Sequence, residues 1–433
     1  MNFKSILNEW LCENIDKKIP LFDTDDGKIK TEIYKETRII KVSNEFKEYF
    51  QMKSKLINES SDCIGFIYIM YFIENNLLIP LYIGRAEKKN GKIMLFQRWL
   101  RNKNSDHMFL FSKVVLEGLT KPEKYKKWQN HLIERNKFKN NVLFAIIPWY
   151  TNSDLIFIKE KVPIKTAEFL LIGLAGEAFP EEILNSEGIS REGIYKIDDI
   201  NNIIPFQKLE ELWDFWINKY IKNNIPLFDE KEGIVSTTMS GRFKVLKRSR
   251  EMEELIEKEV QNVYNDYLPV DKKEFYGVIY IMYTMQENKI IPLYVGKAEK
   301  LGRNGEYSVN LKAVHRGLNK AKFARWGYGH AYHIGDLSMA VLQGTEDRHE
   351  CYQKKPPEKY IRWKNMLFDD NELNQGRIKL KTNLPIYFWM KAWHKNDIGL
   401  FSLAHCSCTF LEYQLIGVSG LIFKDYILNT EGI

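Results

Sequence analysis

The chain has 433 residues, of which 44% are hydrophobic and 28% charged, and its formal net charge is +7. This length predicts two or three domains, and the composition excludes a disordered or fibrous protein. The apolar stretch at residues 65–73 is far shorter than the ~20 residues that cross a bilayer, so we expect no membrane span. Five cysteines are too few for a disulfide framework, which favours a reducing, cytoplasmic location.

The first half of the chain has the hydrophobic patterns of a small sheet with helices packed around it. Two runs of β-branched and aromatic residues are separated by polar residues around Asn75, which is typical of a β-hairpin. Strands mixed with helices in this way indicate the α+β class. In chain order, the expected elements are helix 5–15, strands 65–72 and 78–83, helices 96–102 and 123–134, strand 142–147 and helix 166–178.

The second half of the chain repeats the first. GFIYIMY at 65–71 returns as GVIYIMY at 277–283, and IPLYIGRAEK at 79–88 returns as IPLYVGKAEK at 291–300. Three further blocks recur in the same order in both copies: IPLFD, PEKY and ILNSEGI, the last with Thr in place of Ser in the second copy. A duplicated unit of roughly 210 residues is far longer than a solenoid repeat, so each copy is expected to be a domain. The second hairpin is predicted at 277–284 and 290–295, and its third strand at 384–389.

The predicted domains are therefore 1–206 and 207–433. Each is a small three-stranded sheet flanked by helices and preceded by an N-terminal arm. The arm and core are 1–64 and 65–189 in the first domain, and 208–276 and 277–433 in the second.

Positive charge is concentrated in the segment that follows each hairpin. Residues 81–150 hold fifteen Lys or Arg against five acidic residues, and residues 294–366 hold fourteen against seven. These segments also contain Trp, Tyr and His, a combination that suits a phosphate backbone, although a solvated helix face would have the same charge. The pattern predicts DNA as the partner and leaves RNA open, because basic stretches do not distinguish the two.

A set of polar residues persists in both copies and points to phosphodiester hydrolysis. A lone carboxylate suits a single Mg²⁺ whose other ligands are water and phosphate. Arginine offers a planar fork to phosphate, and a phenol near a cation can accept a proton from water. The persisting pairs are Tyr68 and Tyr280, Tyr82 and Tyr294, Arg85 and Lys297, Arg98 and Arg325, His107 and His333, Glu168 and Glu412, and Asn185 and Asn429.

The pattern G-x-I-Y followed by L-Y-I/V-G-K/R-A-E-K resembles the GIY-YIG nuclease superfamily. The resemblance covers residues 65–189 and 277–433 and implies a three-stranded sheet with flanking helices in each copy. It also implies one Mg²⁺ or Mn²⁺ in each active unit.

In that family the first motif tyrosine is a proposed proton acceptor, and the second positions the attacking water. The arginine stabilises the pentacovalent phosphate, the glutamate holds the metal, and the asparagine braces the site. The residues implied for these roles are, in that order, Tyr68 and Tyr280, Tyr82 and Tyr294, Arg98 and Arg325, Glu168 and Glu412, and Asn185 and Asn429. Further catalytic candidates are His107, Lys297 and His333, the last in competition with His330.

The sequence departs from the family pattern in ways that leave alternatives open. Each Gly-Ile-Tyr element has an extra residue, and Gly335 and Asp336 have no counterparts after His107. Two active units would make a restriction-type enzyme for phage defence or a mobile element, cutting both strands as a monomer with pseudo-dimeric repeats. The alternatives are a nickase in which only the second unit cuts and the first clamps DNA, or a non-catalytic DNA-binding protein on a nuclease fold.

Two further groups of residues are open to more than one interpretation. A basic run ahead of the second hairpin is a candidate DNA contact or a solubilising edge strand. His405, Cys406 and Cys408 have the spacing of metal ligands but lack a fourth partner, so we do not expect zinc there. The candidate DNA contacts are Arg85, Arg242, Lys244, Lys247 and Arg248.

Overall fold

The computed structural model divides the chain into two compact units, Met1–Ile189 and Ser190–Ile433. The predicted domain junction at residue 206 lies outside the residues that the structure describes. In the described part of the chain, no helix is both long and apolar enough to cross a membrane. The described residues are 3–34, 36–93, 107–156, 158–188, 208–240, 243–265, 274–302, 305–308, 311–312, 334–342, 356, 358–381, 384–401 and 405–432.

The first unit is built on a four-stranded antiparallel sheet in the order β1-β10-β6-β7. Strands β6 (Cys63–Glu74) and β7 (Leu77–Glu87) form the predicted hairpin, and β10 (Leu143–Tyr150) is the predicted third strand. Asn75 and Asn76 turn the hairpin with φ of 50° and 65°, a backbone that asparagine tolerates well. The expectation of three strands is wrong, because β1 (Ile19–Pro20) pairs with β10 at the edge.

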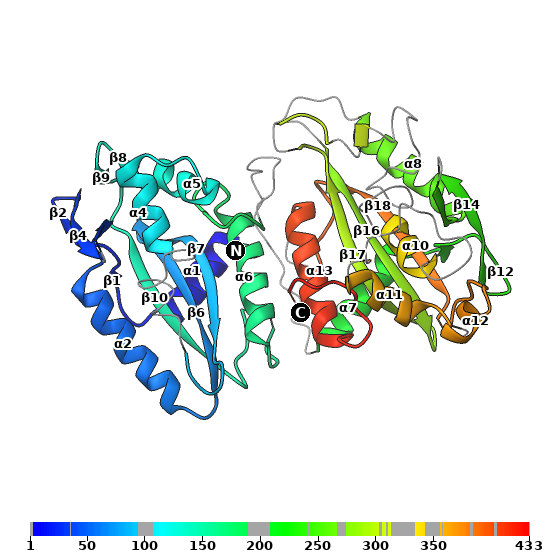
Figure 1. Ribbon diagram of the computed structural model, residues 1–433, viewed down its shortest axis with the longest axis horizontal. Coiled ribbons are helices and arrows are strands. Elements are labelled where there is room, and N and C mark those ends of the chain that lie inside the picture. Colours follow the sequence, from blue (N-terminus) through cyan, green and yellow to red (C-terminus); the bar gives the residue numbers. More distant parts are fainter. Residues whose placement is uncertain are drawn as a thin grey trace. The chain divides into compact units, whose positions relative to one another are not determined.

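Helices cover both faces of this sheet (Figure 1). Phe46 of α2 (Asn44–Glu59) meets Phe144 edge-on at 5.0 Å on one face. α6 (Ile164–Ala178) packs on the other face, where Ile164 approaches Gly65. Because successive strand residues alternate between faces, Tyr68 shares the α2 face with Phe66 and Phe144.

The remaining elements of the first unit confirm most of the predicted helices. The helices expected at 5–15, 123–134 and 166–178 are present, whereas 96–102 lies outside the described residues. The segment predicted as an arm supplies α1, β1 and α2. The other elements are α1 (Phe3–Asn14), α4 (His107–Glu117), α5 (Glu123–Leu132), β2 (Thr24–Asp25), β3 (Lys28–Ile29), β4 (Thr31–Tyr34), β5 (Thr37–Ile40), β8 (Ile133–Glu134) and β9 (Lys137–Phe138).

The second unit has a sheet of the same order, β11-β18-β16-β17. Its strands are β11 (Ile225–Pro226), β18 (Ile386–His394), β16 (Phe275–Gln286) and β17 (Lys289–Glu299). The two units are thus similar α+β halves. The other described elements are α7 (Leu209–Tyr220), β12 (Glu230–Lys231), β13 (Ile234–Val235), β14 (Thr237–Ser240), β15 (Phe243–Leu246), α8 (Arg250–Tyr264), α10 (Ile334–Leu342), α11 (Glu358–Leu367), α12 (Asp370–Asn374) and α13 (Cys408–Ile422).

Candidate functional site

The motif tyrosines of the first unit lie side by side on the hairpin. Tyr68 of β6 and Tyr82 of β7 have ring centroids 6.1 Å apart. Tyr68 is opposite Gly84, and a Cβ on that glycine would lie 2.4 Å from the tyrosine Cζ. The glycine therefore lets the phenol cross β7 towards the free edge of the sheet.

The second unit repeats this arrangement. Tyr280 of β16 and Tyr294 of β17 have ring centroids 6.4 Å apart. A Cβ on Gly296 would lie 2.5 Å from Cζ and from the hydroxyl oxygen of Tyr280. A glycine is thus needed at the same point of both motifs for the same steric reason.

Asn185 and Glu168, two other recurring residues of the first unit, hydrogen-bond to the outer edge of β7. Asn185 accepts a hydrogen bond from Ile83 N at 3.0 Å and donates one to Ile83 O at 2.8 Å. Two residues further on, the backbone N–H of Arg85 donates to the carboxylate of Glu168. Outward-facing backbone groups of an edge strand need partners, and here the partners are an amide and an acid.

The edge of β17 is bound in the same way in the second unit. Asn429 bonds to both Val295 N and Val295 O at 2.9 Å, and the backbone of Lys297 donates to Glu412. In both units the recurring acid faces the hairpin next to the tyrosine pair. Burial raises the pKa of Tyr294, and the charge of Glu412 raises it further, so the two groups are close enough to interact electrostatically.

We expect Asn429→Ala to lower the stability of the second unit by about 1–3 kcal/mol, because both backbone groups of Val295 lose a buried partner. Urea denaturation of the variant and of the parent measures this difference. The exposed Asn371 provides the control, since Asn371→Ala should leave the midpoint nearly unchanged. Equal loss in both variants would contradict a bracing role for Asn429.

The acid of the first unit is already paired with a cation. Arg85 Nε lies 3.2 Å from Glu168 Oε2 and 3.2 Å from Glu87 Oε1. Burial raises the pKa of Glu168, and the charge of Arg85 opposes that rise. Arg85, a candidate DNA contact from the sequence, is thus committed to neutralising Glu168 in this structure.

The acid of the second unit is less well neutralised. Lys297 Nζ lies 3.9 Å from Glu412 Oε2, but only 2.9 Å from Glu299 Oε1 and 2.5 Å from Thr409 Oγ1. Burial raises the pKa of Glu412 to about 7, while Lys297 lowers it. The charges of Glu299 and Glu431 raise it as well, so Glu412 is short of nearby positive charge.

This shortage fits a divalent cation at Glu412. One carboxylate completed by water and phosphate is a common arrangement for Mg²⁺. Among the residues described, no cluster of three or more His, Cys, Asp or Glu side chains could hold an ion by itself. The donor set of the second unit therefore fits a hydrated ion, whereas in the first unit Arg85 already forms an ion pair with the acid.

His107 belongs to the same cluster as the tyrosines of the first unit. Its Nδ1 lies 2.6 Å from the hydroxyl of Tyr125, and its ring stacks on Trp128 at 6.0 Å. The ring centroid of His107 is 5.9 Å from that of Tyr82. The remaining predicted catalytic residues, Arg98, Arg325 and His333, lie outside the described residues, as does His330.

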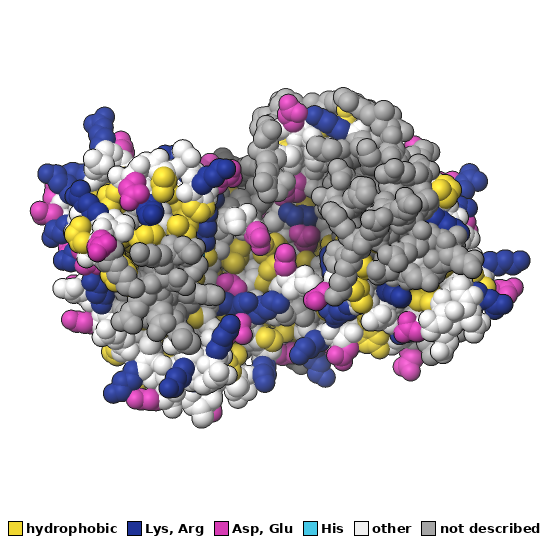
Figure 2. Space-filling model, viewed as in Figure 1, with side chains coloured by type: hydrophobic (Ala, Val, Ile, Leu, Met, Phe, Trp, Pro, Cys, Tyr) yellow, Lys and Arg dark blue, Asp and Glu magenta, His cyan; other side chains and the backbone are white. Residues whose placement is uncertain are grey.

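The basic run of the second unit is only partly available at the surface. The guanidinium of Arg248 is buried, with 1% exposure, and lies 3.2 Å from Glu253, so in this structure it is not accessible for a DNA contact. Lys247 is exposed and pairs with Asp229, Lys244 is half-buried, and Arg242 lies outside the described residues. On the face in Figure 2, described Lys and Arg side chains are interspersed with Asp and Glu.

The sequence analysis missed one recurring contact at the site. Lys124 Nζ donates to the hydroxyl of Tyr82 at 3.1 Å, and Lys359 Nζ lies 4.8 Å from the ring centroid of Tyr294. Both lysines belong to the repeated Pro-Glu-Lys-Tyr block. That recurrence was a usable signal, but sequence alone did not connect the block to the tyrosines.

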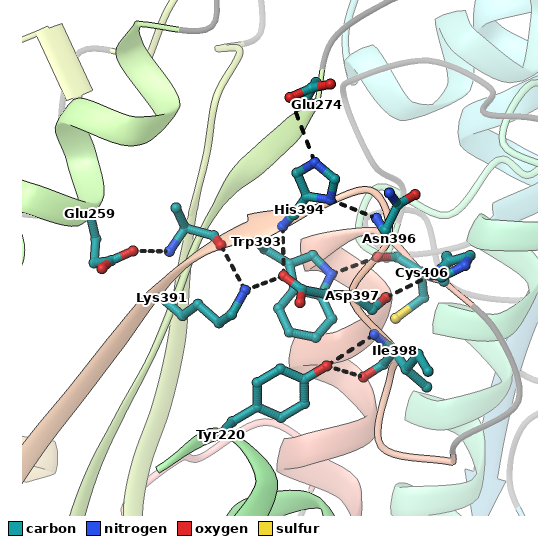
Figure 3. Close-up of polar contacts among 12 residues, drawn as sticks. Tyr220, Glu259, Glu274, Lys391, Trp393, His394, Asn396, Asp397, Ile398 and Cys406 are labelled. Atoms are coloured by element: carbon teal, nitrogen blue, oxygen red, sulfur yellow. Dashed lines mark hydrogen bonds and ion pairs between the residues drawn. The ribbon is translucent and has the colours of Figure 1, made fainter. Parts of the chain in front are cut away.

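The segment around Cys406 forms a hydrogen-bonded corner (Figure 3). Trp393 Nε1 donates to Cys406 O at 2.7 Å. The hydroxyl of Tyr220 bonds to Ile398 N at 3.1 Å and to Ile398 O at 3.2 Å. These hydrogen bonds hold the corner in place.

Comparisons of the chain with protein-family models, curated proteins and solved structures found no match.

Proposed function

We propose that the chain is a divalent-metal-dependent endonuclease that hydrolyses phosphodiester bonds in DNA. The observation that supports this most strongly is a duplicated constellation. In each unit, two phenols on adjacent strands lie beside an acid and an amide that bind the edge of the hairpin. A cation held by an acid next to neutral hydrogen-bond donors suits a phosphate that must be oriented and neutralised.

Each described site residue of the second unit has a role in the proposed reaction. Glu412 would hold the cation, and Lys297, 3.9 Å away, would add positive charge beside the phosphate. Burial raises the pKa of Tyr294 well above its usual value, so this phenol stays protonated near neutral pH and can donate a hydrogen bond. Tyr280 would accept the proton of the attacking water as a phenolate, a form that the charge of the bound cation would favour, while Asn429 keeps β17 in place.

Bound Mg²⁺ or Mn²⁺, one per active unit, would supply Lewis-acid polarisation of a phosphoryl oxygen. Two active units would cut both strands without dimerisation, as expected for a restriction-type enzyme. The test is cleavage of supercoiled plasmid by the full chain with Mg²⁺, with EDTA, and with duplex RNA as the alternative substrate. Failure to cleave any of several DNAs in Mg²⁺ or Mn²⁺ would reject the proposal.

A nickase is the second candidate function, and the ion pair at Glu168 favours it. A guanidinium 3.2 Å from the carboxylate must move before that acid can hold a metal ion. The first unit would then serve to bind DNA. It also has an open, basic hollow of about 530 Å³ beside α5, which suits phosphate groups. The hollow is lined by Thr120, Glu123, Lys126, Lys127, Asn130, His131 and Lys139.

The lining of this hollow has three lysines and a histidine but one glutamate. Burial lowers the pKa of His131, and the charges of Lys139 and Lys127 lower it further. If the hollow contacts DNA, replacing Lys126, Lys127 and Lys139 by glutamine should reduce the slope of log affinity against log salt by about 2–3. DNA binding measured at several salt concentrations gives this slope.

The matched control for this experiment is Lys55→Gln. Lys55 is an exposed lysine on α2 that is ion-paired with Glu59, and its replacement should leave the slope unchanged. An unaltered slope in the triple variant would show that the hollow is not a DNA contact.

A further inference from the structure

A lysine in each unit lies over a shelf of three aromatic rings at the second motif tyrosine. In the first unit, Lys124 Nζ is 4.4 Å from the ring centroid of Tyr82, 5.8 Å from that of Tyr125 and 5.5 Å from that of Trp128. These distances are in the range of cation–π attraction. The lysine and two of its rings come from one turn of α5, at spacings of one and four residues.

The second unit repeats the shelf with nearly the same dimensions. Lys359 Nζ is 4.8 Å from the ring centroid of Tyr294, 5.8 Å from that of Tyr360 and 5.6 Å from that of Trp363. Neighbouring positions have changed: Lys126 and His131 correspond to Ile361 and Met366. The shelf residues persist in both copies, as do Glu123, Asn130 and Leu132, while the other positions of the helix differ.

The buried position of Lys124 disfavours the charged form of its side chain. Burial lowers its pKa to about 8. Within the described ranges, no carboxylate forms an ion pair with Lys124, so its polar partner is the hydroxyl of Tyr82 at 3.1 Å. A lysine on a helix surface could extend into water, and its retention over the shelf in both copies indicates a use for the contact.

The contact fixes the direction of hydrogen bonding at Tyr82. An ammonium group can only donate, so the phenol oxygen of Tyr82 accepts from Lys124. With this bond arriving at its oxygen, the hydroxyl proton of Tyr82 points elsewhere, and the charged donor strengthens the phenol as a donor.

We infer that Lys124 and Lys359 are positioning residues that commit the second motif tyrosine to donating a hydrogen bond to the substrate phosphate. This inference rests on the proposed function for the identity of the acceptor. It gives the two phenols different tasks: Tyr68 and Tyr280 accept from water, whereas Tyr82 and Tyr294 donate to a nonbridging phosphate oxygen. No proton leaves Tyr82 or Tyr294 during the reaction.

The first test measures the contact without cleavage. We place 3-fluorotyrosine at position 82 of the full chain and follow its fluorine chemical shift from about pH 6 to about pH 9, in the parent and in Lys124→Met and Lys124→Arg. In the parent the shift should change as Lys124 loses its charge near pH 8. Both variants should lack that step, and Lys124→Arg, which stays charged, should remain near the parent's shift at low pH. The other groups that face this phenol, Tyr68, His107 and Glu168, are the same in all three proteins.

The same pH dependence of the fluorine shift in a folded Lys124→Met variant would overturn the inference, because the lysine would then be only a packing residue. Circular dichroism checks the fold, and Lys124→Gln replaces the methionine variant if that one does not fold. This titration decides the matter even if the parent cuts no DNA, so it separates failure of the inference from failure of the proposed function.

The second test uses cleavage by the second unit. Lys359→Met should lower kcat by about tenfold with little change in KM, and Lys359→Arg should restore most of the loss. If the lysine acts through the tyrosine, Lys359→Met combined with Tyr294→Phe should be no slower than Tyr294→Phe alone. Losses that multiply, or a loss confined to KM, would show instead that Lys359 contacts the substrate directly.

Discussion

Glu412→Ala is expected to abolish Mn²⁺ binding at the second unit and to slow its DNA cleavage by at least ~10²–10³-fold, because the cation loses the carboxylate proposed to hold it. Mn²⁺ binding followed by electron paramagnetic resonance and plasmid cleavage measure the two effects. The matched variant is Glu168→Ala. If both units cut, Glu168→Ala converts linear product to nicked circles, and if only the second unit cuts, Glu168→Ala changes little.

Metal affinity at Glu412 and the stability of the metal-free fold should both depend on pH. The pKa of Glu412 is raised to about 7 by burial, so protons compete with the metal below that pH and affinity should rise as pH approaches 7. In the metal-free protein, a raised folded pKa stabilises the fold at acidic pH. That stability is present below the ordinary pKa of 4.5 and is lost as pH rises through about 7. Glu412→Ala should remove both dependences.

Gly296→Ala is expected to destabilise the second unit by about 1–3 kcal/mol and to abolish its cleavage. The new Cβ would lie 2.5 Å from the Cζ and hydroxyl oxygen of Tyr280, so the ring must leave its place across β17. Thermal unfolding and the plasmid assay measure the two consequences.

Gly302→Ala is the control for this prediction. Its added Cβ would meet nothing closer than Glu306 O at 3.6 Å, so stability and activity should stay near those of the parent. Tyr280→Phe keeps the ring and removes only the hydroxyl, and it should lose activity while remaining folded. Full activity in Gly296→Ala would show that the crossing of Tyr280 over β17 is not needed for catalysis.

The hairpins and most helices could be predicted because their signals are local. The runs of β6 and β7 flank Asn75 and Asn76, which supply the positive φ of the turn. Strand β1 could not be predicted, since its two residues, one of them proline, are identified as a strand only by the pairing of Ile19 with Phe144. Helix α2 has an apolar face at Phe46 and Phe50 that periodicity could have revealed.

The candidate site was predictable in its members but not in its electrostatics. Duplication singled out Glu168 and Glu412, and the structure places both acids at the edges of their hairpins. Whether a basic side chain pairs with each acid depends on how the two side chains lie in the folded unit. Arg85 lies 3.2 Å from Glu168, whereas Lys297 lies 3.9 Å from Glu412, and no spacing in the sequence encodes that difference.

The most direct test of the central claim is cleavage of supercoiled plasmid by the doubly substituted chain, Glu168→Ala with Glu412→Ala. The account predicts Mg²⁺-dependent cleavage by the parent, none by the double variant, and no cleavage by either protein in EDTA. Parent-like cutting by a folded double variant would contradict the assignment of these acids as metal ligands.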